Sequence, residues 1–177
     1  RCSLSYECVP TEAWSVAGGK AGIRAVWCIE CEECFRVCPT RAIGVMEDDF
    51  VMVAGYKHRI RRAPTLFFAM FDDRVPRDTI YRIITELGFT EICTVEQSVD
   101  TLIPEINHYV ENAANKPVIS SFCPAVVRLI QVRFPFLVDN IMQIKPPLEI
   151  TAQYYNHRFA EEGVPADDVG IFYLTPC

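Results

Sequence analysis

The sequence lacks the features that define several large classes of protein. In its 177 residues, no apolar run reaches the roughly 18–20 residues that a membrane helix needs, and its start lacks the shape of a signal peptide. The formal net charge of −6 argues against nucleic acid as the main partner. A composition of 50% hydrophobic and 23% charged residues excludes a disordered tail. We therefore expect a folded, cytoplasmic protein without a membrane span.

The sequence also lacks several common catalytic and binding motifs. Its three histidines are scattered, without the spacing of a metal-binding pair. The pair Gly18-Gly19 is too little for a phosphate-binding loop, and no Ser-His-Asp arrangement can be recognised. Cysteine, in contrast, is abundant, with nine residues in the chain. Because a disulfide framework in a small secreted chain normally has an even number of cysteines, the cysteines indicate metal binding instead.

The larger, C-terminal part of the sequence alternates between short apolar runs and amphipathic stretches. The apolar runs predict strands at 65–71, 91–95, 116–120 and 169–176. The amphipathic stretches predict helices within 76–88, 99–110, 124–134 and 147–163. This alternation predicts an α/β fold with a mainly parallel sheet covered on both faces. The basic stretch 57–62 is interpreted as a linker or an exposed edge, or alternatively as a docking patch for an acidic partner.

Residues 28–39 contain the motif C-x2-C-x2-C-x3-C-P. Cysteines at this spacing hold a 4Fe-4S cubane, because Cys28, Cys31 and Cys34 can each bind a different corner. The fourth, Cys38, would ligate a second cluster, as in two-cluster ferredoxins. A zinc knuckle would instead have two separated C-x2-C pairs. Residues 1–55 are therefore predicted to form a small ferredoxin-like α+β module with one 4Fe-4S cluster or two.

An incomplete first copy of this motif precedes it. The sequence P-T-E-A at 10–13 resembles P-T-R-A at 39–42 with an offset of 29 residues, whereas the cysteines at 2 and 8 match those at 28 and 34 with an offset of 26. The difference predicts that the first copy has lost three residues, including its fourth cysteine. One cluster would then use Cys28, Cys31, Cys34 and the missing ligand. The other would use Cys2, Cys8 and Cys38, with Ser5 as a weak candidate for its fourth ligand.

Two other cysteines directly follow predicted strands. Cys123 comes after 116–120, and Cys177 comes after 169–176. Since ligands bind outside the carboxyl ends of strands in open α/β sheets, the two thiols could face one pocket. The alternative for each is an ordinary buried thiol. Cys93 lies within or beside a strand and is interpreted as a core residue.

Three motifs resemble, in the same order, those of the catalytic domain of iron-only hydrogenase large subunits. They are S-S-F-C-P at 120–124, K-P-P at 145–147 and T-P-C at 175–177. The resemblance covers residues 62–177, and a ferredoxin-like stretch is the usual neighbour of that domain. It implies that Cys123 and Cys177 are two of the four thiolates that hold the cubane part of an active-site cluster. It also implies that Lys145 lies near the di-iron part of that site.

The sequence departs from this family at two places. Phe122 stands where the family has a proton-relay cysteine, and a phenyl ring cannot carry a proton. The third motif, C-x3-C, which would supply the other cubane ligands, does not occur before Cys177. The resemblance therefore implies an iron–sulfur redox protein of an electron-transfer or sensory kind, with a redox partner protein or signalling module. The alternatives are a piece of a true hydrogenase that forms H2, with a hydrogenase-type active-site cluster, or an electron-transfer subunit whose α/β domain only docks.

Overall fold

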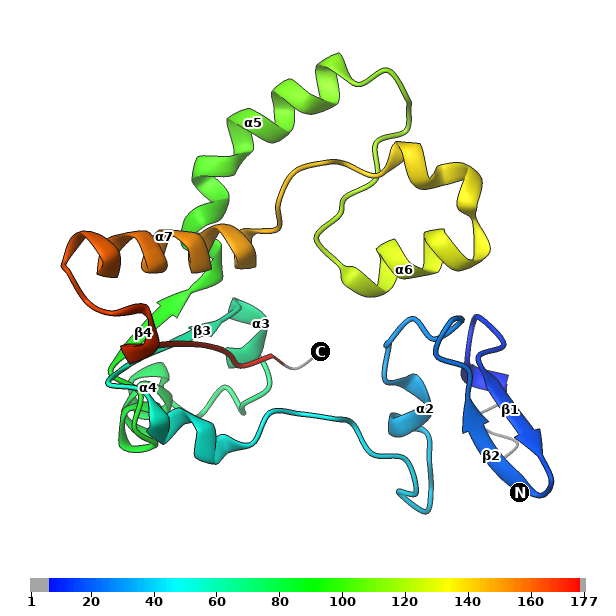
Figure 1. Ribbon diagram of the computed structural model, residues 1–177, viewed down its shortest axis with the longest axis horizontal. Helices are drawn as coiled ribbons and strands as arrows, with labels where there is room; N and C mark the ends of the chain where they lie inside the picture. The colour runs from blue at the N-terminus through cyan, green and yellow to red at the C-terminus, as the bar shows by residue number, and fades with distance from the viewer. Residues whose placement is uncertain (1–6, 176–177) are drawn as a thin grey trace. The chain divides into compact units, whose positions relative to one another are not determined.

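The chain forms two compact units in a computed structural model that describes residues 7–175, apart from the side chains of Gln97 and Ser98 (Figure 1). The first, here called the cysteine unit, comprises the described residues up to Glu47 together with Asn112–Ile144. The second, the sheet unit, comprises Asp48–Glu111 and the described residues from Lys145 onward. The division into domains at 1–55 and 62–177 stays a prediction. Within the described part of the chain, no helix has the length and apolar character needed to cross a membrane.

A three-stranded parallel sheet organises the sheet unit. Its strand order is β4-β3-β5, with β3 (His58–Ala63) between β4 (Glu91–Thr94) and β5 (Val169–Tyr173). Ile60 in the central strand lies opposite Glu91 on one side and Ile171 on the other. The prediction of an α/β fold with a parallel sheet is confirmed, and so are the strands predicted at 91–95 and 169–176.

The central strand was not expected from the sequence. The basic stretch 57–62, predicted as a linker, an exposed edge or a docking patch, forms most of β3, where Arg61 is fully buried and Arg62 is 8% exposed. The strand predicted at 65–71 is also wrong, because residues Thr65–Phe68 form the short helix α3. Pro64 separates the two elements: it has no backbone N–H to continue the ladder, so the strand ends before it.

Both faces of the sheet are covered, as predicted. On one face, Tyr155 and Phe159 of α7 (Pro147–Glu161) pack against Ile60 and Cys93. On the other face, α3 and α4 (Arg77–Glu86) supply a second core cluster, and Figure 1 shows α7 and α4 on opposite sides of the strands. The second cluster consists of Val53, Ala63, Phe68, Ile80, Ile84 and Phe89. The interpretation of Cys93 as a core residue is confirmed.

The helices follow the predicted pattern closely. Besides α4 and α7, the chain forms α5 (Val99–Asn112) and α6 (Pro124–Arg133), which begins with a proline in its first turn. Glycines with a left-handed backbone follow α4 and α7, at Gly88 (φ 100°) and Gly163 (φ 74°). Short 3-10 turns complete the described structure: η1 (Phe50–Gly55), η2 (Val95–Ser98), η3 (Pro135–Asn140) and η4 (Ala166–Asp168).

The cysteine unit is built from short elements. Strands β1 (Trp14–Ala17) and β2 (Lys20–Ile23) pair in an antiparallel hairpin, followed by the single-turn helix α2 (Glu33–Arg36). The hairpin turns at Gly18-Gly19, whose φ angles of 59° and 76° explain the choice of glycine.

The strand predicted at 116–120 is wrong. Only one bridge forms there, between Ile119 and Ile141, both in the cysteine unit. Pro117 cannot donate a backbone hydrogen bond within this segment. Cys123 therefore does not follow a strand of the three-stranded sheet, and the argument that placed its thiol at the mouth of that sheet fails.

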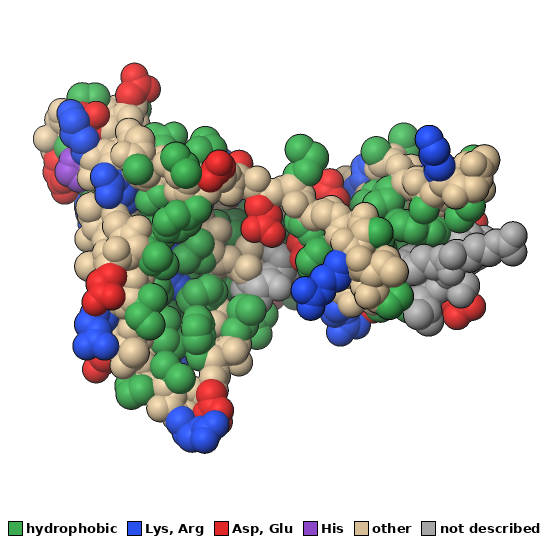
Figure 2. Space-filling model, turned by 90° about the horizontal axis from the view of Figure 1, so that it is seen from below, with side chains coloured by type: hydrophobic (Ala, Val, Ile, Leu, Met, Phe, Trp, Pro, Cys, Tyr) green, Lys and Arg blue, Asp and Glu red, His purple; other side chains and the backbone are tan. Residues whose placement is uncertain are grey.

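The sheet unit carries many exposed apolar side chains. Figure 2 shows hydrophobic side chains gathered along one face of this unit. Eleven large ones in this unit are at least 39% exposed: Phe50, Val51, Met52, Leu66, Met70, Phe71, Ile83, Leu87, Ile103, Val110 and Tyr154. Contiguous exposed apolar surface is uncommon on isolated soluble proteins and often marks an interaction surface.

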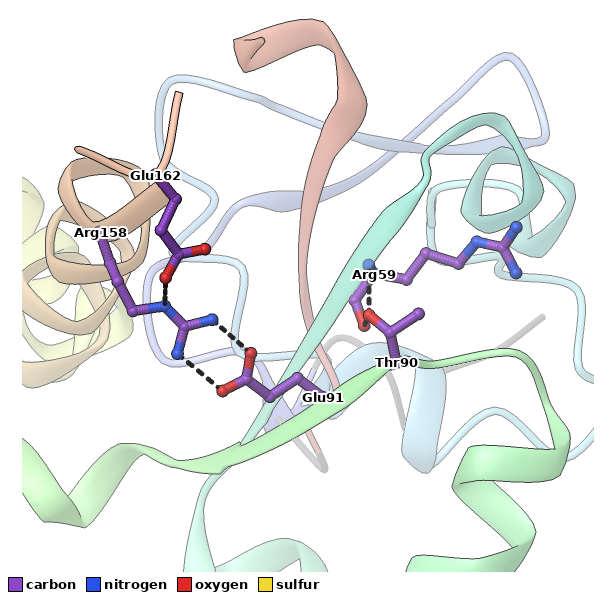
Figure 3. Close-up of polar contacts among 5 residues, drawn as sticks. All are labelled: Arg59, Thr90, Glu91, Arg158 and Glu162. Carbon is purple, nitrogen blue, oxygen red and sulfur yellow. Dashed lines mark hydrogen bonds and ion pairs between the residues drawn. The ribbon is translucent and has the colours of Figure 1, made fainter. Parts of the chain in front are cut away.

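An ion pair joins α7 to strand β4 (Figure 3). The Arg158 guanidinium donates two hydrogen bonds to the Glu91 carboxylate, at 2.9 and 2.6 Å, and forms a 3.5 Å ion pair with Glu162. It also lies over the rings of Tyr155 and Phe159, with the Arg158 Cζ at 4.8 and 4.6 Å from the two ring centroids. These contacts fix α7 on its face of the sheet. The Arg158 hydrogen bonds hold the pKa of Glu91 below its ordinary value of 4.5.

We expect Arg158→Ala to lower the free energy of unfolding by about 2 kcal/mol, because it removes a bidentate charged hydrogen bond and two ring contacts. Since the pKa of Glu91 is lowered in the folded state, the contribution is complete above pH 4.5 and is lost as the pH falls through the lowered value. Urea unfolding at pH 7 and pH 4 measures both effects. His157→Ala is the control, because the His157–Glu161 pair is 76% and 70% exposed and should contribute little. Equal losses in the two variants would contradict the prediction.

Candidate metal centre

Three cysteines of the C-x2-C-x2-C motif line one narrow cavity in the cysteine unit. Cys28, Cys31 and Cys34 are each half-buried there, around a space of about 30 Å³. The remaining lining is mostly apolar: Val9, Thr11, Ala13, Trp14, Ile23, Ile29 and Glu32. Apolar surroundings limit solvent access to a cluster, which is one way in which a protein sets its potential. The three thiols therefore have the donor type and the surroundings that an iron–sulfur cluster requires.

The backbone between these cysteines has an unusual conformation. Glu30 and Glu32 have left-handed φ angles of 57° and 58°, on either side of Cys31. Left-handed residues that alternate with ordinary ones turn backbone N–H groups toward a common centre, an arrangement found at many iron–sulfur sites. The loop is thus shaped to surround a negatively charged group.

Two buried hydrogen-bond donors at this cavity have no partner among the described residues. They are the Thr11 hydroxyl and the indole Nε1–H of Trp14, and both residues line the cavity with the three thiols. Leaving a buried donor unpaired costs about 1–3 kcal/mol. Cluster sulfurs accept hydrogen bonds, and both residues line the cavity in which a cluster would lie.

The three thiols do not converge on one point. Within the described residues, no group of three or more His, Cys, Asp or Glu side chains could hold a single metal ion. A cubane differs from a single ion because each of its cysteines binds a different iron, so the thiolates stand apart around it. A zinc ion, in contrast, needs four ligands at about 2.3 Å from one centre.

The pKa of the Cys34 thiol reflects its burial and the nearby cysteines. Burial raises the pKa of Cys34 above its ordinary value, and the neighbouring Cys28 and Cys31 raise it further. Three thiolates in one apolar space repel one another, and bound iron would offset this repulsion.

Cys38 lies apart from the other three. It is 7% exposed, and it is not among the described residues that line the narrow cavity. Its sulfur contacts the Thr40 hydroxyl at 3.5 Å and accepts a hydrogen bond from the Ala42 amide at 3.4 Å. These contacts lower the pKa of Cys38 to about 7, so its thiolate, the form that binds metal, is readily formed at neutral pH.

The ligands predicted in the first copy of the motif are only partly described. Cys8 is half-buried and lies within electrostatic range of Arg36, whose main partner is Glu33 at 2.7 Å. Cys2 and Ser5 lie outside the described residues. The predicted set of Cys2, Cys8 and Cys38 therefore stays a prediction.

Of the two cysteines in the hydrogenase-like motifs, only Cys123 lies within the described residues. Cys123 is exposed and directly precedes α6, and Phe122 beside it is half-buried. Cys177 lies outside the described residues, so its predicted pairing with Cys123 stays a prediction. Lys145 forms a 2.9 Å ion pair with Glu149, one helical turn along, and is 56% exposed. The surface position of Lys145 neither requires nor opposes a role in cofactor binding.

The cysteine loop and the S-S-F-C-P motif line a common, larger cavity of about 800 Å³. Cys28 and Cys34 contribute from the loop, and Ser121 and Pro124 contribute from the other motif. Arg128 of α6 joins the two sides, because its Nη2 donates to the Val26 carbonyl at 3.0 Å and its Nε to the Cys28 carbonyl at 3.4 Å.

We expect Arg128→Ala to loosen the cysteine loop. Amide exchange at residues 24–31 should rise about fivefold, which corresponds to ~1 kcal/mol, the usual net value of a hydrogen bond. Hydrogen–deuterium exchange with mass spectrometry on the metal-free chain measures this directly. Arg133→Ala is the matched control, since Arg133 lies on the same helix but forms only an exposed 3.5 Å pair with Glu12. Unchanged exchange at 24–31 in Arg128→Ala would contradict the expected role.

Sequence reasoning did not identify Thr11, Trp14 or Arg128. The P-T-x-A repeat pointed to Thr11 as part of the module, but nothing in the sequence indicated that Thr11 lines the cavity of the thiols. Arg128 is one of 17 basic residues, and its contact spans a separation of 100 residues. Contacts of that range are not visible in local patterns.

Comparisons with known proteins identify relatives of this chain. Residues 56–177 match the family model described as "Iron only hydrogenase large subunit, C-terminal domain". Over 134 residues the chain is 26% identical to the cytosolic Fe-S cluster assembly factor NAR1 of Scheffersomyces stipitis. The match covers 72% of this chain and 24% of that protein, so the chain corresponds to about a quarter of the length of this relative.

Proposed function

The chain belongs to the iron-only hydrogenase family, through the C-terminal domain of the large subunit, and on this premise we propose that it is an iron–sulfur redox protein. Its cluster is a 4Fe-4S cubane on Cys28, Cys31 and Cys34, and its role is electron transfer or sensing rather than rapid hydrogen turnover. The observation that carries the proposal is the shared cavity of the three thiols, which also presents the unpaired donors of Thr11 and Trp14.

A second cluster on Cys38 with Cys8 and Cys2 forms part of the proposal. The separate position of Cys38 and its lowered pKa support it. Cys123 and Cys177 are proposed as ligands of a hydrogenase-type cluster that needs further ligands. When bound, these clusters supply one-electron oxidation and reduction; the protein's own groups bind them and exclude water.

Phe122 supports a role without fast hydrogen chemistry, because its ring cannot accept or release a proton. The decisive assay is hydrogen evolution from reduced viologen by the full chain, after anaerobic maturation with the di-iron unit. We expect a reducible cluster and no measurable hydrogen. Hydrogen evolution that depends on Cys123 would favour the alternative, a part of a true hydrogenase.

Cluster assembly is a second candidate function, favoured by the similarity to NAR1, which is an Fe-S cluster assembly factor. In this role the chain would transfer its cluster to a recipient protein. Incubation of the iron-loaded chain with an apo-ferredoxin separates the two candidates. Transfer of iron and sulfide to the recipient supports assembly, whereas electron transfer without loss of iron supports the redox role.

The exposed apolar face of the sheet unit supports a protein partner, which we propose to be a redox partner or a signalling module.

A further inference from the structure

The two P-T-x-A segments have the same backbone conformation. Glu12 in the first segment has a φ of 56°, and Arg41 in the second has a φ of 51°. Few residues other than glycine adopt this left-handed conformation, so its occurrence at the third position of both segments identifies them as structural equivalents. The offset of 29 residues therefore holds in the structure as well as in the sequence.

This equivalence places Val9 opposite Cys38. Cys38 directly precedes Pro39, and Val9 directly precedes Pro10. The sequence comparison, which relied on the spacing of Cys2 and Cys8, attributed the missing ligand to a three-residue deletion. Whichever change removed the ligand, the residue before the proline of the first segment is now Val9, whose isopropyl group cannot bind iron.

The surroundings of Val9 show what is missing. In the second segment the Thr40 hydroxyl contacts the sulfur of Cys38 at 3.5 Å. In the first segment the equivalent hydroxyl, that of Thr11, is buried and has no partner among the described residues. The donor is thus retained at a position where the sulfur that it would serve is absent.

Val9 also lies at the correct site. Together with Thr11 it lines the narrow cavity of Cys28, Cys31 and Cys34, and Cys38 is not among the described residues there. In two-cluster modules the cysteine before proline in one copy ligates the cluster of the other copy. The residue at Val9 would therefore be the fourth ligand of this cluster.

We infer that the cluster on Cys28, Cys31 and Cys34 has one iron that faces Val9 and has no protein ligand among the described residues, and that this iron binds a small exogenous thiolate. The inference rests on the proposed cluster. In the binding step an Fe–S bond forms, a weakly held buffer ligand leaves, and the thiol proton passes to the buffer. No electron is transferred. The narrow cavity favours a small thiolate over a side chain of another protein.

The test is a titration of the reconstituted, dithionite-reduced full chain with 2-mercaptoethanol, followed by electron paramagnetic resonance. We expect the thiol to change the cluster signal of the natural chain, and the change to be lost in Val9→Cys, which supplies the fourth thiolate. Val16→Cys is the matched control: it makes the same substitution at a site that is 65% exposed in β1, so it should respond like the natural chain. Circular dichroism verifies that both variants fold.

Cys8, the residue before Val9 in the sequence, is the alternative fourth ligand. If Cys8 were the fourth ligand, the natural chain would not respond to the thiol and Cys8→Ser would respond, which would overturn the inference. An equal response of Val9→Cys and the natural chain would also overturn it. A variant without Cys28, Cys31 and Cys34 tests the proposed cluster separately, since an iron content equal to that of the natural chain would refute the cluster whatever the result at Val9.

Discussion

A variant in which Cys28, Cys31 and Cys34 are all replaced by serine should lose about four irons and about four sulfides per chain, the content of one cubane. The three thiols are the donors that share the narrow cavity, and serine binds iron weakly in their place. Iron and acid-labile sulfide are measured after anaerobic reconstitution.

The matched control for this loss is Cys93→Ser. Cys93 is 4% exposed, packs against α7 in the sheet unit and is not part of any cysteine motif. Its replacement should reduce stability while the iron content stays as in the natural chain. An equal iron content in the triple variant and the control would show that the motif does not carry the cluster.

Arg61→Met should raise the free energy of unfolding by about 2 kcal/mol at pH 7, because it removes a buried charge that lacks a charged partner. All three side-chain nitrogens of Arg61 are buried without a hydrogen-bond partner among the described residues. Its guanidinium lies over two aromatic rings, with its Cζ at 4.3 Å from the Phe67 centroid and 5.6 Å from the Phe68 centroid. Methionine has a similar length and also packs well against aromatic rings.

Arg61 also gives this stability difference a pH dependence. Burial lowers the pKa of Arg61 to about 10. Below that pH both folded and unfolded chains carry the charge, and the folded state bears the full cost of burying it. As the pH rises above 10, the folded state releases the proton first, so the cost declines. The advantage of Arg61→Met should therefore be largest below pH 10 and shrink above it.

Arg62→Met is the control for this substitution. Arg62 is the next residue of the same strand and is also buried, but its guanidinium donates a hydrogen bond to the Leu148 carbonyl. Arg62→Met removes this hydrogen bond, so it should lower stability. Urea unfolding of both variants measures the contrast, and a loss of stability in both would show that the charge of Arg61 is compensated in the folded protein.

Arg61 and Arg62 also show why the sequence misled in one part of the fold. A run of arginines before Ala63-Pro64 resembles solvated surface, and the apolar run after it resembles a buried strand. The structure differs because Pro64 has no backbone N–H to donate to the ladder. The strand therefore ends before Pro64, and a helix begins after it. The helices were easier to predict, since α4, α6 and α7 have apolar spacing and clear proline or glycine ends.

The candidate metal centre was predictable only in part. The spacing of Cys28, Cys31 and Cys34 identified the ligands, and the motifs around Cys123 and Cys177 indicated the family. The roles of Thr11 and Val9 depend on which side chains face the thiols, a property of the folded loop. The sequence-based reason for placing Cys123 beside a sheet relied on a strand at 116–120, where only the single bridge Ile119–Ile141 forms.

The direct test for a 4Fe-4S cluster in this protein is metal and sulfide analysis of the anaerobically reconstituted full chain, combined with electron paramagnetic resonance after reduction. If the chain binds the proposed 4Fe-4S cluster, we expect at least about four irons and four sulfides per chain and a cubane signal. A chain that binds zinc in stoichiometric amount, without sulfide and without a signal on reduction, would contradict it.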